Sequence, residues 1–328
     1  MMPTSLLSPV PPPAVRPRRA SGAGDTVFKS LTWFFTGVVL LLLGGVVIVL
    51  VDGAVPALGV FGFGFVTSAN WNPVTDVYGA AVPLVGTLLT SLIAMLIAVP
   101  ASIAIAFFLT ELCPYRLRRP IGTAIELLAA VPSIIYGIWG LFVVAPLFQH
   151  SLEPFLMAVF GPLPLIGRLF VGPPIGIGIL LAGVILGVMV LPFITAVMRD
   201  VFASVPPVVR EAAYGMGSTR FEVMWHVILP YCRVGATGAV MLGLGRALGE
   251  TMAVTFVIGN AHRLSASLLA PGTTIASALA NEFTEAVGDL YTSALVALGL
   301  MLFLLTFCVL AAGRWMLMRL QIREEGLT

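Results

Sequence analysis

The stretch REAAYGMGSTRFEVMWHVILPYCR, residues 210–233, is the longest polar-leaning segment in the second half of an otherwise apolar chain. Its EAA part favours a helix, and the glycines of GMG permit a sharp change of direction. Thr219 and Glu222 have the spacing of a capping box, which predicts the start of a second short helix. We expect Ser204 to cap the first helix and Pro230 to end the second. The stretch is therefore predicted to form a helix–turn–helix.

The composition around this stretch is that of a polytopic membrane protein. Of the 328 residues, 59% are hydrophobic and only 10% are charged, with a mean hydropathy of +1.06, whereas soluble domains carry about 25% charged residues. The three cysteines are isolated in sequence, so neither a disulfide framework nor a zinc site is indicated. Runs of about 20 apolar residues predict spanning helices. Six such runs occur, at residues 31–51, 82–110, 121–146, 174–197, 235–258 and 291–313.

The distribution of basic residues predicts the orientation of these spans. Of the 17 Lys and Arg residues, 14 fall in the segments on one side, Arg168 and Arg263 fall on the other, and Arg246 lies within a span. Cytoplasmic loops carry the excess of Lys and Arg. Both termini, and the helix–turn–helix between the fourth and fifth spans, are therefore predicted to be cytoplasmic. The Pro-rich residues 1–27 are predicted to be a disordered cytoplasmic tail.

The helix–turn–helix resembles the EAA loop of ABC-importer permeases. The family pattern is E-A-A, three residues, G, nine residues and I-x-L-P, and Val227 stands here where isoleucine is usual. The resemblance implies that residues 198–233 form a coupling loop that docks on a cytoplasmic ATPase. The residues assigned to this role are Glu211, Ala212, Ala213, Gly215, Gly217, Leu229 and Pro230.

Other stretches are similar to the permease of phosphate importers, of the PstC type rather than the PstA type. They include VPSIIYGIWG (131–140) and GLGRALGETMAVTFVIGN (243–260), and the resemblance runs from about residue 28 to the end. It implies an all-α membrane protein with six transmembrane helices and the type I ABC importer permease fold, located in the bacterial inner membrane. It also divides the chain into a first span with an external segment (28–81), a core permease domain (82–318) and a cytoplasmic tail (319–328).

The same resemblance implies a set of partners and inorganic phosphate as the substrate. The partners are a second permease of the PstA type, a cytoplasmic ATPase dimer of the PstB type and an external phosphate-binding protein of the PstS type. A Walker A site requires the sequence G-x-x-x-x-G-K-[ST], and the only lysine, Lys29, follows Phe28 rather than glycine. The chain is therefore predicted to be a transport subunit that is not an enzyme and has no cofactor of its own, with ATP bound by the partner.

Two ionisable residues lie inside the predicted fifth span. Arg246 and Glu250 are four residues apart and would share one helical face, and each costs about 2.5–3.5 kcal/mol at a helix centre on insertion scales. A self-neutralising ion pair would explain them, but ionisable groups within spans are by default functional, and a guanidinium suits phosphate oxygens. We therefore predict a substrate pathway at Arg246, with Glu250 holding the arginine and Thr251 offering a hydroxyl.

Several alternatives remain open at this stage. The substrate is phosphate or another oxyanion such as sulfate or molybdate, and a secondary transporter or channel that needs no ATPase is the rival of another class. Glu126 is expected to reach the interface or a neighbouring helix. Glu282, Glu285 and Asp289 share one face of a predicted external helix, which is either solvated or a docking surface.

Overall fold

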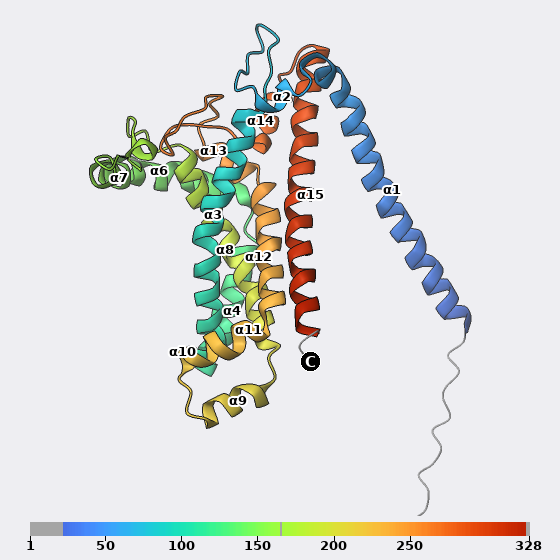
Figure 1. The fold of residues 1–328 in the computed structure, drawn as a ribbon, viewed down its shortest axis with the longest axis vertical. Coiled ribbons are helices and arrows are strands. Elements are labelled where there is room, and N and C mark those ends of the chain that lie inside the picture. Colours follow the sequence, from blue (N-terminus) through green and yellow to red (C-terminus); the bar gives the residue numbers. More distant parts are fainter. Residues whose placement is uncertain (1–21, 165, 326–328) are drawn as a thin grey trace, which may run out of the picture. The chain divides into compact units, whose positions relative to one another are not determined.

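The computed structural model describes residues 22–164 and 166–325, and every regular element in those ranges is a helix (Figure 1). The chain divides into two units, 1–49 and 50–328. Of the predicted disordered tail, residues 1–21 lie outside the described ranges and residues 22–27 are helical. The helices are α1 (Gly22–Phe61), α2 (Gly64–Thr67), α3 (Ala81–Phe107), α4 (Tyr115–Ala129), α5 (Ser133–Trp139), α6 (Ala145–Leu147), α7 (Glu153–Phe160), α8 (Ile179–Ala203), α9 (Pro207–Gly215), α10 (Arg220–Glu222), α11 (Leu229–Tyr231), α12 (Arg233–Leu248), α13 (Met252–Val257), α14 (Ile275–Glu282) and α15 (Asp289–Glu325).

Within the described ranges, five helical stretches are long and apolar enough to cross a membrane, or six if one bent pair is counted as a span. The bent pair joins Arg220–Tyr231 to Arg233–Leu248 at 78°. The five are Gly24–Phe61, Ala81–Leu112, Ser133–Phe160, Ile179–Ala203 and Asp289–Arg319. The predicted spans 31–51, 82–110 and 291–313 lie inside three of them, whereas the predicted 174–197 begins too early.

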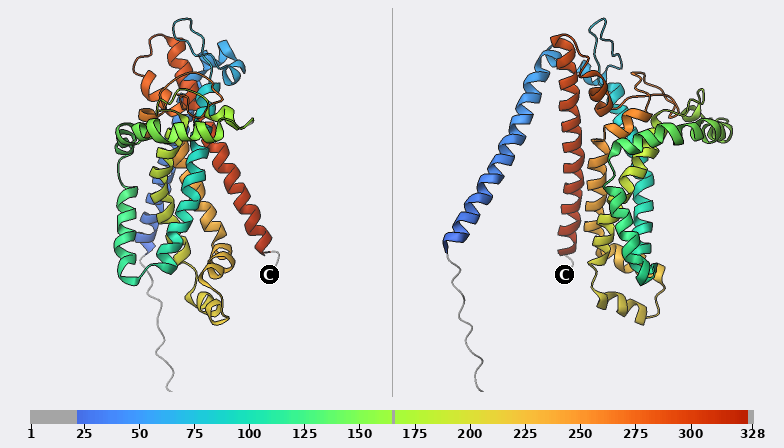
Figure 2. Two further views of the ribbon diagram at one scale, coloured as in Figure 1. Left: turned by 90° about the vertical axis from the view of Figure 1, so that its left-hand side faces the viewer. Right: turned by 180° about the vertical axis from the view of Figure 1, so that it is seen from behind.

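The predicted third span, 121–146, is wrong because the chain breaks in its middle. α4 ends at Ala129, and Pro132 precedes α5. Proline has no N–H to donate and disfavours the helical conformation of the residue before it. The stretch Ser133–Phe160 then crosses the upper end of its unit in Figure 2 instead of running along α3 and α8.

The centre of the second unit is α8, which packs between α3, α4 and α12. Its buried side chains include Ile185, Leu186, Ile194 and Met198, all within one apolar core cluster. Small residues of α3, among them Ala94 and Ala98, are fully buried. They let the backbones of α3 and α8 approach closely, as is typical of membrane bundles. α15 packs on α12 from the other side (Figure 1).

A second apolar cluster joins α14 and the first part of α15 to residues 54–80. The Ser293 hydroxyl fixes the end of α1 there, because it accepts the Ala57 N–H at 2.9 Å and donates to the Gly53 carbonyl at 2.7 Å. In Figure 1 this cluster lies at the upper end of the second unit, whereas the coupling loop and the end of α15 lie at the lower end. The coupling loop and the end of α15, two of the segments that the basic residues assign to the cytoplasm, therefore share one end of this unit.

Candidate functional site

The predicted fifth span, 235–258, is interrupted near its middle. α12 ends at Leu248, residues 249–251 are not helical, and α13 begins at Met252. The chain is held across the interruption by weak backbone bonds, since Gly249 N–H donates to the Gly245 carbonyl at 3.4 Å. Non-helical backbone at membrane depth is tolerated only where it is buried in protein or lines a water-filled cavity. The break is therefore expected to lie against protein or beside a water-filled cavity.

Arg246 lies one turn before this break. It is 13 residues beyond the start of α12, or about 20 Å along the helix, which places it within a hydrocarbon core about 30 Å thick. Its side chain is exposed on the isolated chain, and its Cζ lies 5.7 Å from the centroid of the Phe193 ring. The face of the Phe193 ring attracts the Arg246 guanidinium. This contact orients the guanidinium but leaves its N–H donors available.

Glu250 does not hold Arg246 as predicted. Because α12 ends at Leu248, Glu250 leaves the helical face that carries Arg246, and its Oε1 accepts the Ala253 N–H at 3.2 Å instead. Within residues 166–325 the structure forms no ion pair between Arg246 and Glu250. Glu250 therefore stabilises the first turn of α13, and it leaves the guanidinium without a carboxylate partner.

Thr251 belongs to the non-helical residues of the break. Its hydroxyl makes a long bond of 3.4 Å to the Gly249 carbonyl, while its own carbonyl accepts the Thr255 hydroxyl at 2.7 Å and the Thr255 N–H at 3.0 Å. The three predicted pathway residues thus lie around one helix break. A cation without a carboxylate partner at membrane depth is suited to make transient contacts with an anion.

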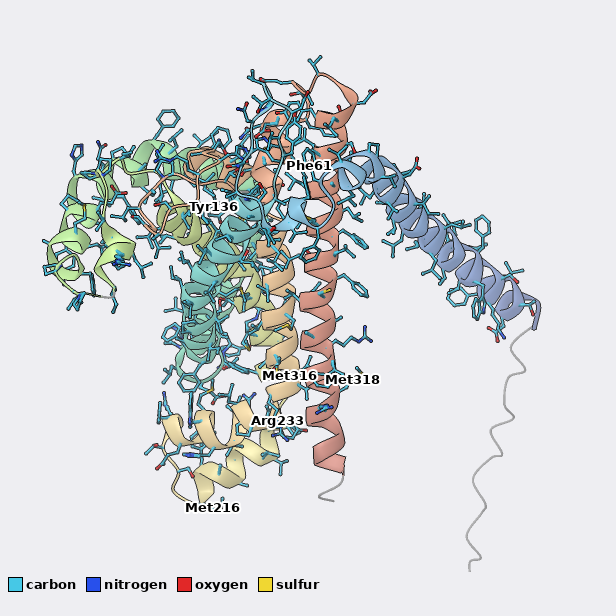
Figure 3. The ribbon with its side chains drawn as sticks, turned by 45° about the horizontal axis from the view of Figure 1, so that its top comes forward. Phe61, Tyr136, Met216, Arg233, Met316 and Met318 are labelled. Carbon is cyan, nitrogen blue, oxygen red and sulfur yellow. The ribbon has the colours of Figure 1, made fainter. Side chains whose placement is uncertain are left out.

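The coupling loop is built largely as its sequence predicts. Pro207 is the first residue of α9, and Gly217 has a φ of +87°, which glycine adopts without strain. The capping box is confirmed, because Glu222 Oε2 accepts the Thr219 N–H at 2.7 Å and Thr219 Oγ1 accepts the Glu222 N–H at 3.4 Å. Met216, in the turn between α9 and α10, lies at the lower extremity of the unit (Figure 3).

Two details of the loop differ from the prediction. Ser204 does not cap α9, because its hydroxyl donates back to the Val201 carbonyl at 2.7 Å and so closes the end of α8. Pro230 does not end the second helix, because the chain stays helical to Tyr231 through a π-helical segment, Val223–Ile228. π-helical turns bond residues five apart, and the sharp bend comes after Tyr231, where α12 starts.

The EAA residues present different faces. Ala213 is buried against the core, whereas Glu211, Ala212 and Gly215 are exposed. Leu229 is half-buried and Pro230 is exposed. The buried alanine fixes how α9 lies on the bundle, and the exposed residues form a surface that a second protein can reach.

The contact that anchors α9 is not predicted by any local sequence pattern. Glu111, in the π-helical turn Phe108–Leu112 after α3, accepts Arg210 Nη1 at 2.8 Å and the Tyr214 hydroxyl at 3.2 Å. Its side chain is 8% exposed, and that of Arg210 is 19% exposed. Burial and the adjoining Glu111 carboxylate raise the pKa of Tyr214. Arg210 also donates to the Phe202 carbonyl, so α9 is tied to the ends of both α3 and α8.

At the opposite end, the predicted acidic face of Glu282, Glu285 and Asp289 is wrong. α14 ends at Glu282 and α15 starts at Asp289, so no single helix carries all three residues. The Glu282 carboxylate instead accepts Trp71 Nε1–H at 2.8 Å and the Tyr291 hydroxyl at 2.7 Å, and lies 2.5 Å from His262 Nε2. Glu282 is thus the centre of an inward-facing cluster.

The electrostatics of this Glu282 cluster are set by its hydrogen bonds. Burial raises the pKa of Glu282, but the bonds from His262, Tyr291 and Trp71 outweigh it and lower the pKa overall. Burial and the nearby Asp76 carboxylate raise the pKa of Tyr78 to about 12. The cluster joins segments far apart in the chain, and it stabilises the upper end of the second unit.

Comparisons with known proteins agree on one family. A family model described as "Binding-protein-dependent transport system inner membrane component" matches residues 83–321. A Mesorhizobium japonicum protein named "Phosphate transport system permease protein PstC" is 58% identical over 316 residues, covering 95% of this chain and 97% of that protein. A Pasteurella multocida protein of the same name is 57% identical over 300 residues, covering 92% and 93% of the two chains.

Solved structures show a similar fold. A chain of a bacterial alginate ABC transporter, solved with an alginate pentasaccharide-bound periplasmic protein, has a TM-score of 0.61 to this chain. The two are 17% identical, and the match covers 91% of this chain and 96% of that one. At this identity the likeness concerns the fold alone.

Proposed function

We propose, on the premise that this chain belongs to the family of binding-protein-dependent transport system inner membrane components, that it conducts inorganic phosphate along a route past Arg246. The chain is a multi-pass permease of the inner membrane and a transport component. Phosphate is the substrate because relatives that are 57% and 58% identical over nearly the whole chain are phosphate permeases by name. The observation that supports this route is the helix break at residues 249–251 beside an exposed arginine.

An exposed guanidinium at this depth cannot face lipid hydrocarbon at acceptable free energy. Arg246 therefore faces a second permease subunit of the PstA type, or a water-filled path between the two subunits. Because Glu250 is engaged by the Ala253 N–H, the arginine is free to donate to a passing phosphate. A single arginine gives a weak contact, which suits a conduit that must also release its substrate.

The energy comes from a partner. A cytoplasmic ATPase dimer of the PstB type contacts the exposed surface of α9, including Glu211, Ala212 and Gly215, and an external phosphate-binding protein of the PstS type delivers the substrate at the other end. The Glu111–Arg210 contact passes movement of α9 to the ends of α3 and α8. The core permease domain, 82–318, thus holds both the route and the coupling loop 198–233.

The route is tested by phosphate uptake into proteoliposomes that contain the assembled importer. We expect Arg246→Gln to lower uptake by roughly 10- to 100-fold, because a hydrogen bond to a charged group contributes about 1.5–3 kcal/mol. Arg314→Gln removes an arginine near the end of α15 and is the matched control, expected to retain uptake. Normal uptake by Arg246→Gln would remove this residue from the route.

The same preparation tests the rival substrates. Excess sulfate or molybdate is expected to leave phosphate uptake unchanged, and strong competition by either would assign the permease to another oxyanion. ATPase dependence is tested by Glu211→Lys, which reverses the charge on the exposed face of α9. We expect this variant to lose co-purification with the ATPase; uptake that continues without ATPase would indicate a secondary transporter or channel.

A further inference from the structure

A pocket lined by arginines lies at the lower end of the second unit, outside the proposed route. It is formed between the π-helical turn after α3, one side of α4 and the end of α8. Its lining includes Arg116, Arg118, Arg119 and Arg199, with Glu126 as the one acidic lining residue. We call these five residues the arginine pocket. Its lining carries a surplus of three positive charges, which favours an anionic occupant.

Two of the four arginines are held by protein groups. Arg199 Nη2 donates to Glu126 Oε1 at 2.7 Å and to Asp200 Oδ1 at 3.1 Å, and Arg118 donates to the Thr110 carbonyl. Within the described ranges, Arg116 and Arg119 make no ion pair or hydrogen bond through their side chains. Their planar donor groups are therefore available to a phosphate-type ligand.

The position of Arg199 requires a glycine on α4. A Cβ atom at Gly122 would lie 2.6 Å from Arg199 Nη1, so any larger residue would push the guanidinium away. With glycine there, Arg199 reaches across α4 to Glu126, a residue 73 positions away in sequence. The floor of the pocket is thus built by the packing of α4 on α8, and is not a chance grouping of mobile surface side chains.

The surroundings of the pocket are those of a membrane boundary. Arg116, Arg119 and Glu126 are spaced to share one face of α4, and the exposed apolar side chain of Leu127 lies at the edge of that face. Basic pockets between helices on the cytoplasmic side of a membrane bind anionic lipid headgroups. A ligand with both a phosphate group and an acyl chain can contact the arginines and this leucine at once.

We propose that the arginine pocket binds the phosphodiester headgroup of an anionic phospholipid, such as phosphatidylglycerol or cardiolipin. Arg116 and Arg119 bind the phosphate oxygens, and Arg199 supplies the fixed charge of the floor. Free inorganic phosphate shares this chemistry but has no acyl chain to lie along Leu127. The bound lipid holds the start of α4 against the end of α8, next to the turn that carries Glu111.

The test measures the lipid retained by the intact importer purified in mild detergent. Native mass spectrometry of the wild-type complex, after exchange into phosphatidylcholine with a trace of cardiolipin, is expected to show bound cardiolipin. Each basic residue near an anionic membrane surface contributes about 1 kcal/mol, so the double variant Arg116→Gln/Arg119→Gln should bind cardiolipin about 30-fold more weakly. Arg314→Gln/Arg319→Gln removes two arginines at the end of α15 and should bind it normally.

Each other outcome overturns the proposal. An equal loss in both double variants would mean that general surface charge attracts the lipid. Displacement of the cardiolipin by millimolar inorganic phosphate would assign the pocket to free phosphate, and absence of bound lipid from the wild type would leave no lipid site. Arg246→Gln should retain the lipid, so failure of the transport route and failure of this site are distinguishable.

Discussion

Replacing Glu111 by glutamine should loosen α9 from the bundle without removing it. The substitution keeps the shape of the side chain but leaves the Arg210 guanidinium, 19% exposed, without its carboxylate. Breaking a fully buried ion pair costs about 3–5 kcal/mol. Arg210 keeps some solvent contact and its bond to the Phe202 carbonyl, so we expect roughly 2 kcal/mol, which is about 30-fold in the local opening equilibrium.

The assay is amide hydrogen exchange of residues 207–215 in the nucleotide-free importer reconstituted in nanodiscs. Glu111→Gln should raise their exchange by about 30-fold, and Tyr214→Phe, which removes only the 3.2 Å bond, should raise it by about 5-fold. Glu222→Gln removes a carboxylate from the same loop while keeping its capping geometry, and it should leave residues 207–215 unchanged.

The functional consequence follows from the same contact. If α9 transmits movement through Glu111, the Glu111→Gln importer should still bind its ATPase but should transport less phosphate per ATP hydrolysed. In the double variant Glu111→Gln/Arg210→Gln no charge is left unpaired, so its effect should be smaller than the sum of the single effects. Unchanged exchange in Glu111→Gln, or equal changes in Glu222→Gln, would refute the assignment of Glu111 as the anchor of α9.

Three further outcomes are expected. Thr219→Ala removes a cap worth about 1 kcal/mol and should raise amide exchange at residues 220–228 by about 5-fold, whereas Ser218→Ala should not. The pKa of Glu282 is lowered from 4.5, so its contribution to stability is complete above pH 4.5 and is lost as the pH falls through the folded-state pKa; thermal unfolding of Glu282→Gln should lack this acid-dependent loss. The pKa of Tyr78 is raised to about 12, so its contribution to stability is complete below pH 10 and is lost as the pH rises towards 12. The tyrosinate absorbance that disappears in Tyr78→Phe should titrate near pH 12. Titration of this absorbance near pH 10 would contradict the burial of the Tyr78 hydroxyl.

Much of the coupling loop was predictable because its determinants are local. The capping box at Thr219 and the left-handed conformation of Gly217 depend on neighbours within three or four residues, and the structure confirms both. The failures at Ser204 and Pro230 have another cause. Ser204 bonds to the end of the preceding helix, and the π-helical segment keeps the chain helical past Pro230. Both features depend on how adjacent helices join.

The candidate route rests on residues that the sequence singles out, but their geometry differs from the predicted one. Arg246 and Glu250 stand out because ionisable residues are costly in a membrane, which is visible in sequence. Their ion pair depended on a continuous helix, and the break after Leu248 removes it. The sequence GLGRALGET is equally compatible with an unbroken spanning helix. The break is accompanied by the packing of α13 on α5, whose residues lie more than a hundred positions earlier in the chain.

By itself, the sequence determined that this is a helical membrane protein with a capped, glycine-hinged coupling loop and one arginine at membrane depth. Hydropathy, charge placement and capping are properties of short segments, so they can be recognised in the sequence without knowledge of the fold. Only the tertiary structure decided that Glu111 anchors Arg210 across 99 residues, that Trp71 reaches Glu282 across 211, and that Gly122 gives Arg199 its place in the arginine pocket. Such pairings are set by which helices pack together, and their partners lie too far apart in the chain for any local pattern to specify.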